Sequence, residues 1–215
     1  MSSAAAETNP IWARVRLADA GDVPNIHRLL RGLAEYENQT HQFTATESSL
    51  SATLFPSSPF RSFTILLLEI FPNPIHDDLP NPDFTPIVRR VDLGPVQDPE
   101  AATFASAGGG EGAVAAGFVL FFPNYSTFLA KPGLYVEDLF VRGCYRRRGF
   151  GRMLLSAVAA KAAEMGFGRV EWTVLDWNVD AFSFYEKMGA EVLPEWRICK
   201  LSGGALEAYR GGGDV

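Results

Sequence analysis

The stretch that decides the fold is residues 145–155, which read YRRRGFGRMLL. Three consecutive arginines run into two glycines separated by one residue, and an apolar helical pattern starts at once. A strand-like apolar segment, residues 134–141, precedes it. Helix N-termini present unpaired backbone N–H groups and a positive dipole end, and glycine lets a ligand approach the backbone closely. The stretch therefore predicts an anion-binding turn between a strand and a helix.

Charge supports this prediction without deciding it. Five of the 19 Lys and Arg residues fall within residues 142–152, in a chain whose formal net charge is -6. A solvated basic helix start explains the charge alone equally well. Two familiar phosphate motifs are excluded, because Arg152 and Met153 stand where a P-loop needs Lys and Ser or Thr, and Leu154 replaces the third glycine of a dinucleotide fingerprint.

Composition narrows the class of protein. The 215 residues are 47% hydrophobic, which suits one domain with a substantial core. A sequence pI near 5.1 argues against a nucleic-acid-binding protein. Two cysteines are too few for a disulfide framework, and no apolar run approaches the ~20 residues that span a bilayer. We expect a cytoplasmic protein that binds neither nucleic acid nor membrane.

Patterning along the chain predicts a mixed α/β (α+β) class, because strands outnumber helices but alternate with them late in the chain. The expected strands are 11–17, 63–71, 115–122, 134–141, 169–175 and 195–201, with a turn region at 123–133. The expected helices are 22–37 with Asp22 as N-cap, a short one opened by a capping box of Thr44 and Glu47, 150–165 and 179–188.

The domain is expected to span residues 11–209, with a disordered N-terminus at 1–10 and a flexible tail at 210–215. A segment rich in Pro, Asn and Gly at 72–112 reads as an insertion into this domain. We expect it to lie on the surface, with little core of its own, one short strand near 85–91 and partial mobility.

The motif R-x-x-G-x-G at residues 146–151 resembles the acetyl-CoA pyrophosphate motif of the GCN5-related N-acetyltransferase (GNAT) superfamily. Its context strengthens the resemblance: LYVEDLFV precedes it, and VEWTVLDWN and AFSFYEKMGA follow it. The resemblance covers 11–209 apart from the insertion. LAEYE and EWRICKL resemble the diamine (spermidine/spermine-type) subgroup, and the Pro/Asn-rich insertion resembles its plant branch. It implies the GNAT fold, a twisted, mixed but mostly antiparallel sheet flanked by helices, and a homodimer.

The resemblance also implies an acetyl-CoA site. The pyrophosphate would lie on the backbone of the turn, the pantetheine arm along the strand before it, and the start of a later helix against the same arm. The residues so implied are Leu139, Phe140, Val141, Arg146, Arg147, Arg148, Gly149, Phe150, Gly151, Arg152, Asn178, Ala181 and Tyr185. Asn178 has an alternative role as the N-cap of helix 179–188. Tyr185 is the candidate general acid, and its alternative is core packing with Phe182 and Phe184.

Glu137 and Asp138 interrupt an otherwise apolar strand, where adjacent side chains point to opposite faces unless a bulge turns both inward. They are candidates for recognising a cationic amine, with Glu137 as a catalytic base or water relay; ion pairing with nearby arginines is the alternative. The resemblance adds Tyr36 and Glu37 as substrate contacts, and a solvated helix end is their alternative. Asp176 and Trp177 are further candidates, with core packing as the alternative for Trp177. The histidines, His27, His41 and His76, have no metal-site spacing, and Cys144 has no sequence-local base to make it a nucleophile.

These residues predict an acetyl-CoA-dependent N-acetyltransferase that acts on a primary amine of a small di- or polyamine such as diaminopropane, ornithine or putrescine. The amine would attack directly, without an acyl-enzyme. One alternative is N-acylation of tyramine or another aromatic amine, and another is acetylation of protein N-termini or lysines. From a different class, the chain could be a non-catalytic acyl-CoA-binding module, although such a module need not keep Tyr185 and the acidic pair.

Overall fold

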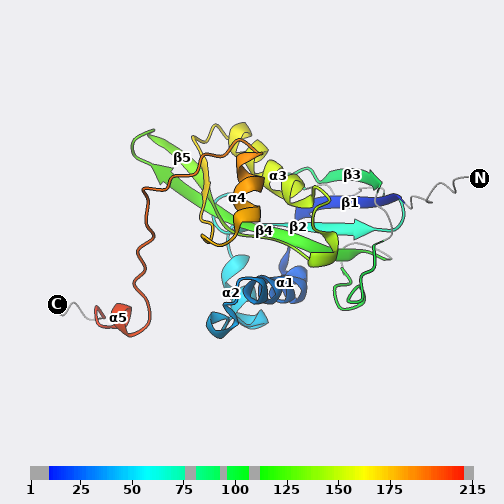
Figure 1. Ribbon diagram of the computed structural model, residues 1–215, viewed down its shortest axis with the longest axis horizontal. Helices are drawn as coiled ribbons and strands as arrows, with labels where there is room; N and C mark the ends of the chain where they lie inside the picture. The colour runs from blue at the N-terminus through cyan, green and yellow to red at the C-terminus, as the bar shows by residue number, and fades with distance from the viewer. Residues whose placement is uncertain (1–9, 76–80, 93–95, 107–111, 211–215) are drawn as a thin grey trace, which may run out of the picture. The chain divides into compact units, whose positions relative to one another are not determined.

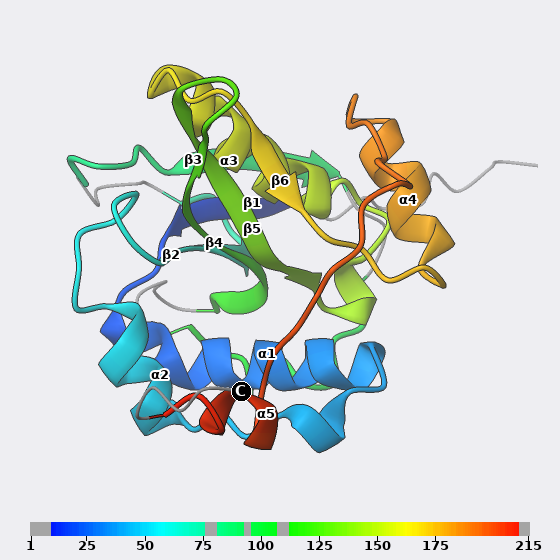
Figure 2. The same cartoon turned by 90° about the vertical axis from the view of Figure 1, so that its left-hand side faces the viewer.

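The computed structural model describes residues 10–75, 81–92, 96–106 and 112–210, and its chain forms two compact units that divide after Thr173. The first unit is built on a six-stranded sheet of order β3-β1-β2-β4-β5-β6 (Figures 1 and 2). Neighbouring strands are antiparallel except β5 and β6, which are parallel. The strands are β1 (Pro10–Leu17), β2 (Thr64–Phe71), β3 (Ile87–Asp92), β4 (Val114–Ser126), β5 (Lys131–Val141) and β6 (Val170–Trp172). The predicted mixed, mostly antiparallel sheet is confirmed.

Helices cover both faces of this sheet. One face carries α1 (Val23–Tyr36) with α2 (Glu47–Leu54) beside it, and the other carries α3 (Phe150–Glu164) (Figures 1 and 2). The second unit contains α4 (Val179–Glu186) and the one-turn α5 (Gly204–Glu207). None of the helices in the described part of the chain is long and apolar enough to cross a membrane.

The core on the α1 side fixes the position of β5. Ile26, Leu29 and Leu33 of α1 pack on alternate residues of the central strands, among them Phe118 and Phe140. Each fully buried side chain of this kind contributes ~1.5–3 kcal/mol. A Cβ on Gly32 would stand only 3.2 Å from the Phe140 ring, so the absence of a side chain at this position lets α1 approach β5 closely.

One predicted helix cap is wrong, and the other is confirmed in position only. The cap of α2 is formed by Thr46, whose hydroxyl accepts from Ser49 N–H in a capping box, not by Thr44 and Glu47. Asp22 does occupy the N-cap position of α1, but its carboxylate caps nothing there. Instead Asp22 accepts two hydrogen bonds from the Arg16 guanidinium, at 2.7 and 2.8 Å, because a buried arginine needs a carboxylate partner.

One predicted turn region and two predicted strands also differ from the structure. The expected turn region at 123–133 is mostly sheet, since β4 and β5 continue their pairing as far as Ser126 and Lys131. The predicted strand at 169–175 shrinks to the three residues of β6, and the predicted strand at 195–201 is absent, because that segment pairs with no other strand in the described chain. An apolar alternation predicts a strand only where a partner edge exists to pair with it.

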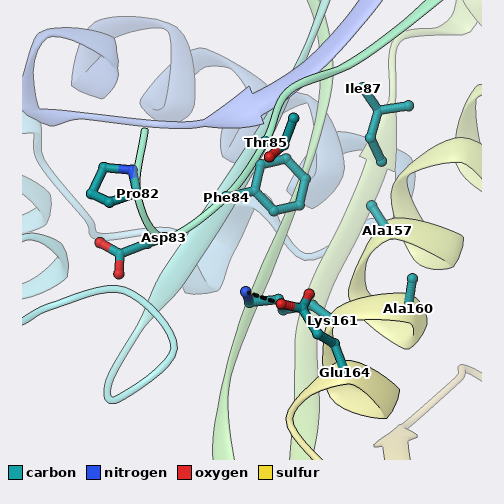
Figure 3. Close-up of a pocket in the computed structure, with 9 residues that line it drawn as sticks. All are labelled: Pro82, Asp83, Phe84, Thr85, Ile87, Ala157, Ala160, Lys161 and Glu164. Carbon is teal, nitrogen blue, oxygen red and sulfur yellow. Dashed lines mark hydrogen bonds and ion pairs between the residues drawn. The ribbon is translucent and has the colours of Figure 1, made fainter. Parts of the chain in front are cut away.

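The insertion at 72–112 contains the expected short strand, which is the edge strand β3 paired to β1. The expectation that the insertion lies on the surface is wrong for Phe84 and Phe104, which are buried. Its segment 82–87 and residues 157–164 of α3 line a pocket of about 250 Å³ (Figure 3). Parts of the insertion lie outside the described residues, as do 1–9 and 211–215, so the predicted mobility and disorder stay predictions.

Candidate active site

The Arg/Gly turn, which we define as residues 146–152, joins a one-turn 3-10 helix, Gly143–Tyr145, to α3. Gly149 is the N-cap of α3, with a left-handed φ of 83°, and no side chain caps the helix. The first intrahelical bond runs from Met153 N–H to Gly149 O. The N–H groups of Phe150 and Gly151 therefore have no acceptor within the helix. A Cβ on Gly149 would meet no atom within 4 Å, so this helix end is open to a ligand.

A second left-handed residue lies in the turn. Arg147 has φ 61°, a conformation that costs a non-glycine residue ~1–2 kcal/mol. Backbone strain of this kind concentrates at ligand-binding sites, where the surrounding structure maintains it. Arg147 and Gly149 together turn the chain sharply from β5 into α3.

The arginine cluster is not directed at one point. The Arg142 guanidinium is buried and makes ion pairs with Asp98. Arg146 donates from Nε to Val141 O at 2.7 Å, and its guanidinium carbon lies 4.1 Å from the centroid of the Tyr36 ring and 5.1 Å from that of Phe140. Two of the five clustered arginines, Arg142 and Arg146, thus make contacts away from the N-terminus of α3. The number of positive charges in the sequence does not indicate this.

The outer edge of β5 is open where it approaches the turn. Parallel pairing with β6 stops at Val136, whereas pairing with β4 on the other side continues to Val141. Arg142 N–H donates to Ala116 O on the β4 side, so the polar groups of Val141 and Leu139 point to the outer edge. In the described chain no strand covers this edge at 137–141, which leaves it able to pair with an extended ligand.

The two carboxylates of β5 lie at a bulge. Asp138 pairs with Leu120, and Val136 pairs with the next residue of β4, so Glu137 is the extra residue. Neither carboxylate makes an ion pair in the described chain, in contrast to the alternative of pairing with nearby arginines. Asp138 is half-buried and shares the α1-facing side of the strand with Phe140, while Glu137 is exposed.

A third carboxylate, that of Glu37 at the end of α1, interacts with Asp138. Glu37 is the C-cap residue of α1, and Tyr36 is the last helical residue before it. Burial, then the charges of Glu137 and Glu37, raise the pKa of Asp138 to about 7. Burial also raises the pKa of Glu37. A helix C-terminus is itself partially negative, so three acids here form a region, the acidic cluster, that favours a bound cation.

A family model matches this chain over residues 64–190, and its description is the acetyltransferase (GNAT) family. The chain belongs to the GNAT family. Members use acetyl-CoA as the acetyl donor, so this chain is an N-acetyltransferase, and the resemblance drawn from the R-x-x-G-x-G motif is confirmed.

Relatives agree with this assignment. The chain is 52% identical over 210 residues to L-ornithine N5-acetyltransferase NATA1 of Arabidopsis thaliana, covering 94% of this chain and 91% of that protein. It is 40% identical over 209 residues to tyramine N-feruloyltransferase 4/11 of Nicotiana tabacum, covering 94% and 92%. Thialysine N-epsilon-acetyltransferase of Sus scrofa is 30% identical over 200 residues, covering 92% and 96%.

Solved structures show the same fold at low identity. An integron cassette protein from V. cholerae superposes with a TM-score of 0.58 at 18% identity, covering 91% of this chain and 96% of that one. An aminoglycoside acetyltransferase from an uncultured soil metagenomic sample gives a TM-score of 0.55 at 18% identity, covering 87% and 97%. The predicted GNAT fold is confirmed.

The residues present fit the donor of the GNAT family. The open helix end at Gly149 suits a pyrophosphate, and the uncovered edge of β5 suits the amide-bearing pantetheine arm. Acetyl-CoA would then lie along Leu139 and Phe140 with its phosphates on the N–H groups of α3. Arg146 fits less well than predicted as a phosphate ligand, because its side chain faces Tyr36. The individual ligand assignments stay predictions.

The remaining predicted site residues belong to the second unit of this GNAT enzyme. Asn178 caps α4, with Oδ1 accepting from Ala181 N–H at 3.3 Å, so its capping role is confirmed and its cofactor contact stays a prediction. Tyr185 lies on α4, half-buried, with its ring 5.2 Å from that of Phe184. Asp176 is exposed and Trp177 is half-exposed, in the turn before the helix.

The histidines and cysteines of the described chain are not part of a metal site. Within the described ranges, no group of three or more His, Cys, Asp or Glu side chains is arranged to hold a metal ion. His27 Nε2 lies 3.1 Å from Ala45 O, and His76 lies outside the described residues. Cys144 is half-buried, and burial together with the charge of Asp98 raises the pKa of its thiol.

Proposed function

We propose that this GNAT enzyme acetylates a primary amine of a small di- or polyamine or basic amino acid, of the ornithine, diaminopropane and putrescine class. The acidic cluster of Glu37, Glu137 and Asp138 carries the proposal. A substrate with two ammonium groups needs carboxylates for the amine that is not acetylated, whereas the phenol of tyramine does not. The greater identity to an ornithine acetyltransferase than to a tyramine feruloyltransferase supports the same choice.

The electrostatics of the cluster suit a cation for a second reason. Burial and two neighbouring carboxylates oppose the charge of Asp138 and raise its pKa to about 7. A bound ammonium would relieve that repulsion and supply the positive charge that the C-terminus of α1 favours. The carboxylates would thus be arranged for a ligand and not for the stability of the chain alone.

We further propose direct attack by the amine, with Asp138 rather than Glu137 as the first proton acceptor. A base with a pKa near the working pH combines a useful unprotonated fraction with enough basicity, and Asp138 meets that condition while Glu137 is exposed. When bound, acetyl-CoA supplies the acetyl group as a thioester. Tyr185 would donate a proton to the departing sulfur, because a phenol stays protonated at neutral pH.

The raised pKa of Cys144 supports attack without an acyl-enzyme, since a protonated thiol is a poor nucleophile. Cys199 is exposed and lies in the second unit. No acyl-cysteine step is therefore included in the proposed reaction.

A panel of amines tests the substrate class. Ornithine, diaminopropane, putrescine and tyramine would each be offered with acetyl-CoA, and tyramine also with feruloyl-CoA, while release of free thiol is followed. The proposal expects the diamines and ornithine to turn over with the highest kcat/KM. Efficient turnover of tyramine with no detectable turnover of the diamines would replace it by the aromatic-amine alternative, which the 40% identity to the feruloyltransferase keeps as the second candidate.

Two further expectations are a homodimer, which the resemblance implies, and a cytoplasmic location, which rests on the composition of the chain. Light scattering after size-exclusion chromatography measures the first, where a mass of twice 23.5 kDa is expected and a mass of 23.5 kDa would contradict it. Imaging of the fluorescently tagged chain in plant cells tests the second.

A further inference from the structure

The insertion reaches the start of the Arg/Gly turn through one buried carboxylate. Asp98 accepts hydrogen bonds from both terminal nitrogens of Arg142, at 2.8 and 2.6 Å, and from the hydroxyl of Tyr145 at 2.9 Å. The side chains of Arg142 and Asp98 are only 5% and 7% exposed. This is a bidentate, largely desolvated pair, the kind of ion pair that fixes geometry most strictly.

The ring of Phe104, another residue of the insertion, also contacts the Arg142 side chain. The Arg142 guanidinium carbon lies 3.8 Å from the centroid of the Phe104 ring, and Phe104 is itself part of the core beneath α1. The Arg142 side chain is therefore bounded by insertion residues on its edge and on its face. None of these contacts involves the acidic cluster or the open edge of β5.

Residues 104–106 of the insertion make further contacts with the first unit, so the insertion can support the Arg142 side chain. Ser106 donates from its hydroxyl to the buried Glu69 of β2, and Asn25 of α1 donates from Nδ2 to Ala105 O at 3.0 Å. Ala115 N–H of β4 donates to Phe104 O at 2.8 Å. Two strands and a helix of the first unit thus hold residues 104–106 in place.

The two residues that Asp98 contacts, Arg142 and Tyr145, lie just before the start of α3. Arg142 ends the pairing of β5 with β4 through its N–H, and Tyr145 is buried with its ring against Phe150, the first residue of α3. Between Tyr145 and Phe150 lie Arg147 and Gly149, the two left-handed residues whose conformation shapes the turn. Fixing both flanks of the turn would preserve this strained shape before a ligand arrives.

We propose that the insertion is a working part of the acetyl-CoA site, with Asp98 as a positioning residue that holds Arg142 and Tyr145 and thereby keeps the Arg/Gly turn in its anion-binding shape. The inference rests on the proposed role of that turn in binding the pyrophosphate. It assigns a function to a segment whose polar composition suggests only a surface loop.

The test compares Asp98→Asn with Asp92→Asn, a matched change in the same insertion at an exposed ion pair with Arg90. Asp98→Asn is expected to raise the KM of acetyl-CoA and the calorimetric Kd of CoA by about five- to ten-fold, as networks that touch no ligand do. The kcat at saturating acetyl-CoA and the KM of the amine should change by less than about two-fold, and Asp92→Asn should leave all constants unchanged. An unchanged Kd for CoA in folded Asp98→Asn, or an equal loss in every constant, would overturn the proposal.

Removing Asp98 leaves the Arg142 charge buried without its main partner, so the variant can fail to fold. Tyr145→Phe keeps that ion pair and deletes one hydrogen bond to Asp98. It is expected to raise the Kd of CoA by about two- to three-fold, in line with one hydrogen bond. If Asp98→Asn is unfolded by circular dichroism, an unaltered CoA affinity in Tyr145→Phe overturns the inference.

A charge reversal in the turn itself separates this inference from the assignment beneath it. Arg148→Glu should weaken CoA binding strongly if the turn holds the pyrophosphate. If Arg148→Glu weakens CoA binding and neither Asp98→Asn nor Tyr145→Phe does, only the positioning role fails. If Arg148→Glu leaves CoA binding unchanged, the turn is not the phosphate site.

Discussion

The guanidinium carbon of Arg146 lies 4.1 Å from the centroid of the Tyr36 ring, which joins the Arg/Gly turn to the end of α1. The same residue donates to Val141 O at the outer edge of β5. Arg146 therefore contacts both the predicted donor edge and the residue next to Glu37. The proposed acyl-donor and amine sides of this enzyme therefore share one side chain.

That contact makes Tyr36 a residue whose loss affects both substrates. A cation–π pair of this kind contributes ~0.5–2 kcal/mol. Tyr36→Leu is expected to raise the KM of the amine and of acetyl-CoA together, by about three- to ten-fold. Tyr36→Phe keeps the ring and should cost less in both constants. Steady-state kinetics of the two variants decide the point, and equal losses in Tyr36→Phe and Tyr36→Leu would show that the ring stacking is irrelevant.

The pKa of Asp138 predicts the acid side of the pH profile. Because Asp138 must be ionised to accept a proton, kcat/KM should rise with pH through an apparent pKa near 7. Glu37→Gln removes a negative charge that raises this pKa, so the acid limb should move to lower pH. Asp138→Asn should abolish the limb and most of the activity.

Glu35→Gln is the matched control for that profile, since Glu35 is exposed on the same turn of α1. It should leave the acid limb where it is in the unmodified enzyme. The acid limb could instead stay in place in Glu37→Gln, or shift equally in both variants. Either result would show that Asp138 is not the group whose ionisation produces the acid limb.

Much of this site could be predicted from local sequence, because its parts are local. The strand, arginines, glycines and helix of the turn follow one another in the chain, and Gly149 needs its left-handed conformation wherever the rest of the protein lies. The acidic pair was visible because carboxylates are rare in an apolar strand. Glu37 could be added only through the family resemblance, since α1 and β5 are distant in sequence.

What the sequence could not predict depends on packing between distant segments. Nothing near Arg142 or Arg146 in the chain indicates that one would pair with Asp98 and the other with Tyr36. The polar composition of the insertion concealed the buried Phe104 for the same reason. The choice between Glu137 and Asp138 as the base stays a prediction, and Asp138 is the carboxylate on the same side of the strand as Phe140.

Tyr185→Phe tests the proposed general acid. Loss of the phenolic proton donor should lower kcat by about ten-fold or more, the lower part of the range for such groups, while the Kd of CoA stays nearly unchanged. Tyr209→Phe changes an exposed tyrosine of the same unit and should have no effect. Unchanged turnover in Tyr185→Phe would remove this residue from the reaction.

The two ends of α3 offer a matched pair of glycines. Gly149 and Gly166 have φ of 83° and 70°, and a Cβ on either would meet no atom within 4 Å. Alanine at each position should therefore cost a similar ~1–2 kcal/mol in the free energy of unfolding, from backbone strain alone.

Only Gly149 lies at the predicted phosphate site. Gly149→Ala should thus raise the Kd of CoA several-fold more than Gly166→Ala does, although chemical denaturation shows equal losses of stability. Equal CoA affinities in the two variants would mean that the N-terminus of α3 does not bind the donor.

The central claim is that the acidic cluster selects an amine with a second positive charge. The most direct measurement compares kcat/KM for 1,3-diaminopropane and for n-propylamine, which differ by one ammonium group, at saturating acetyl-CoA and one pH. One charge-assisted interaction should favour the diamine by roughly ten- to one-hundred-fold, and Glu37→Gln should reduce that ratio. Equal kcat/KM values for the two amines would contradict the account.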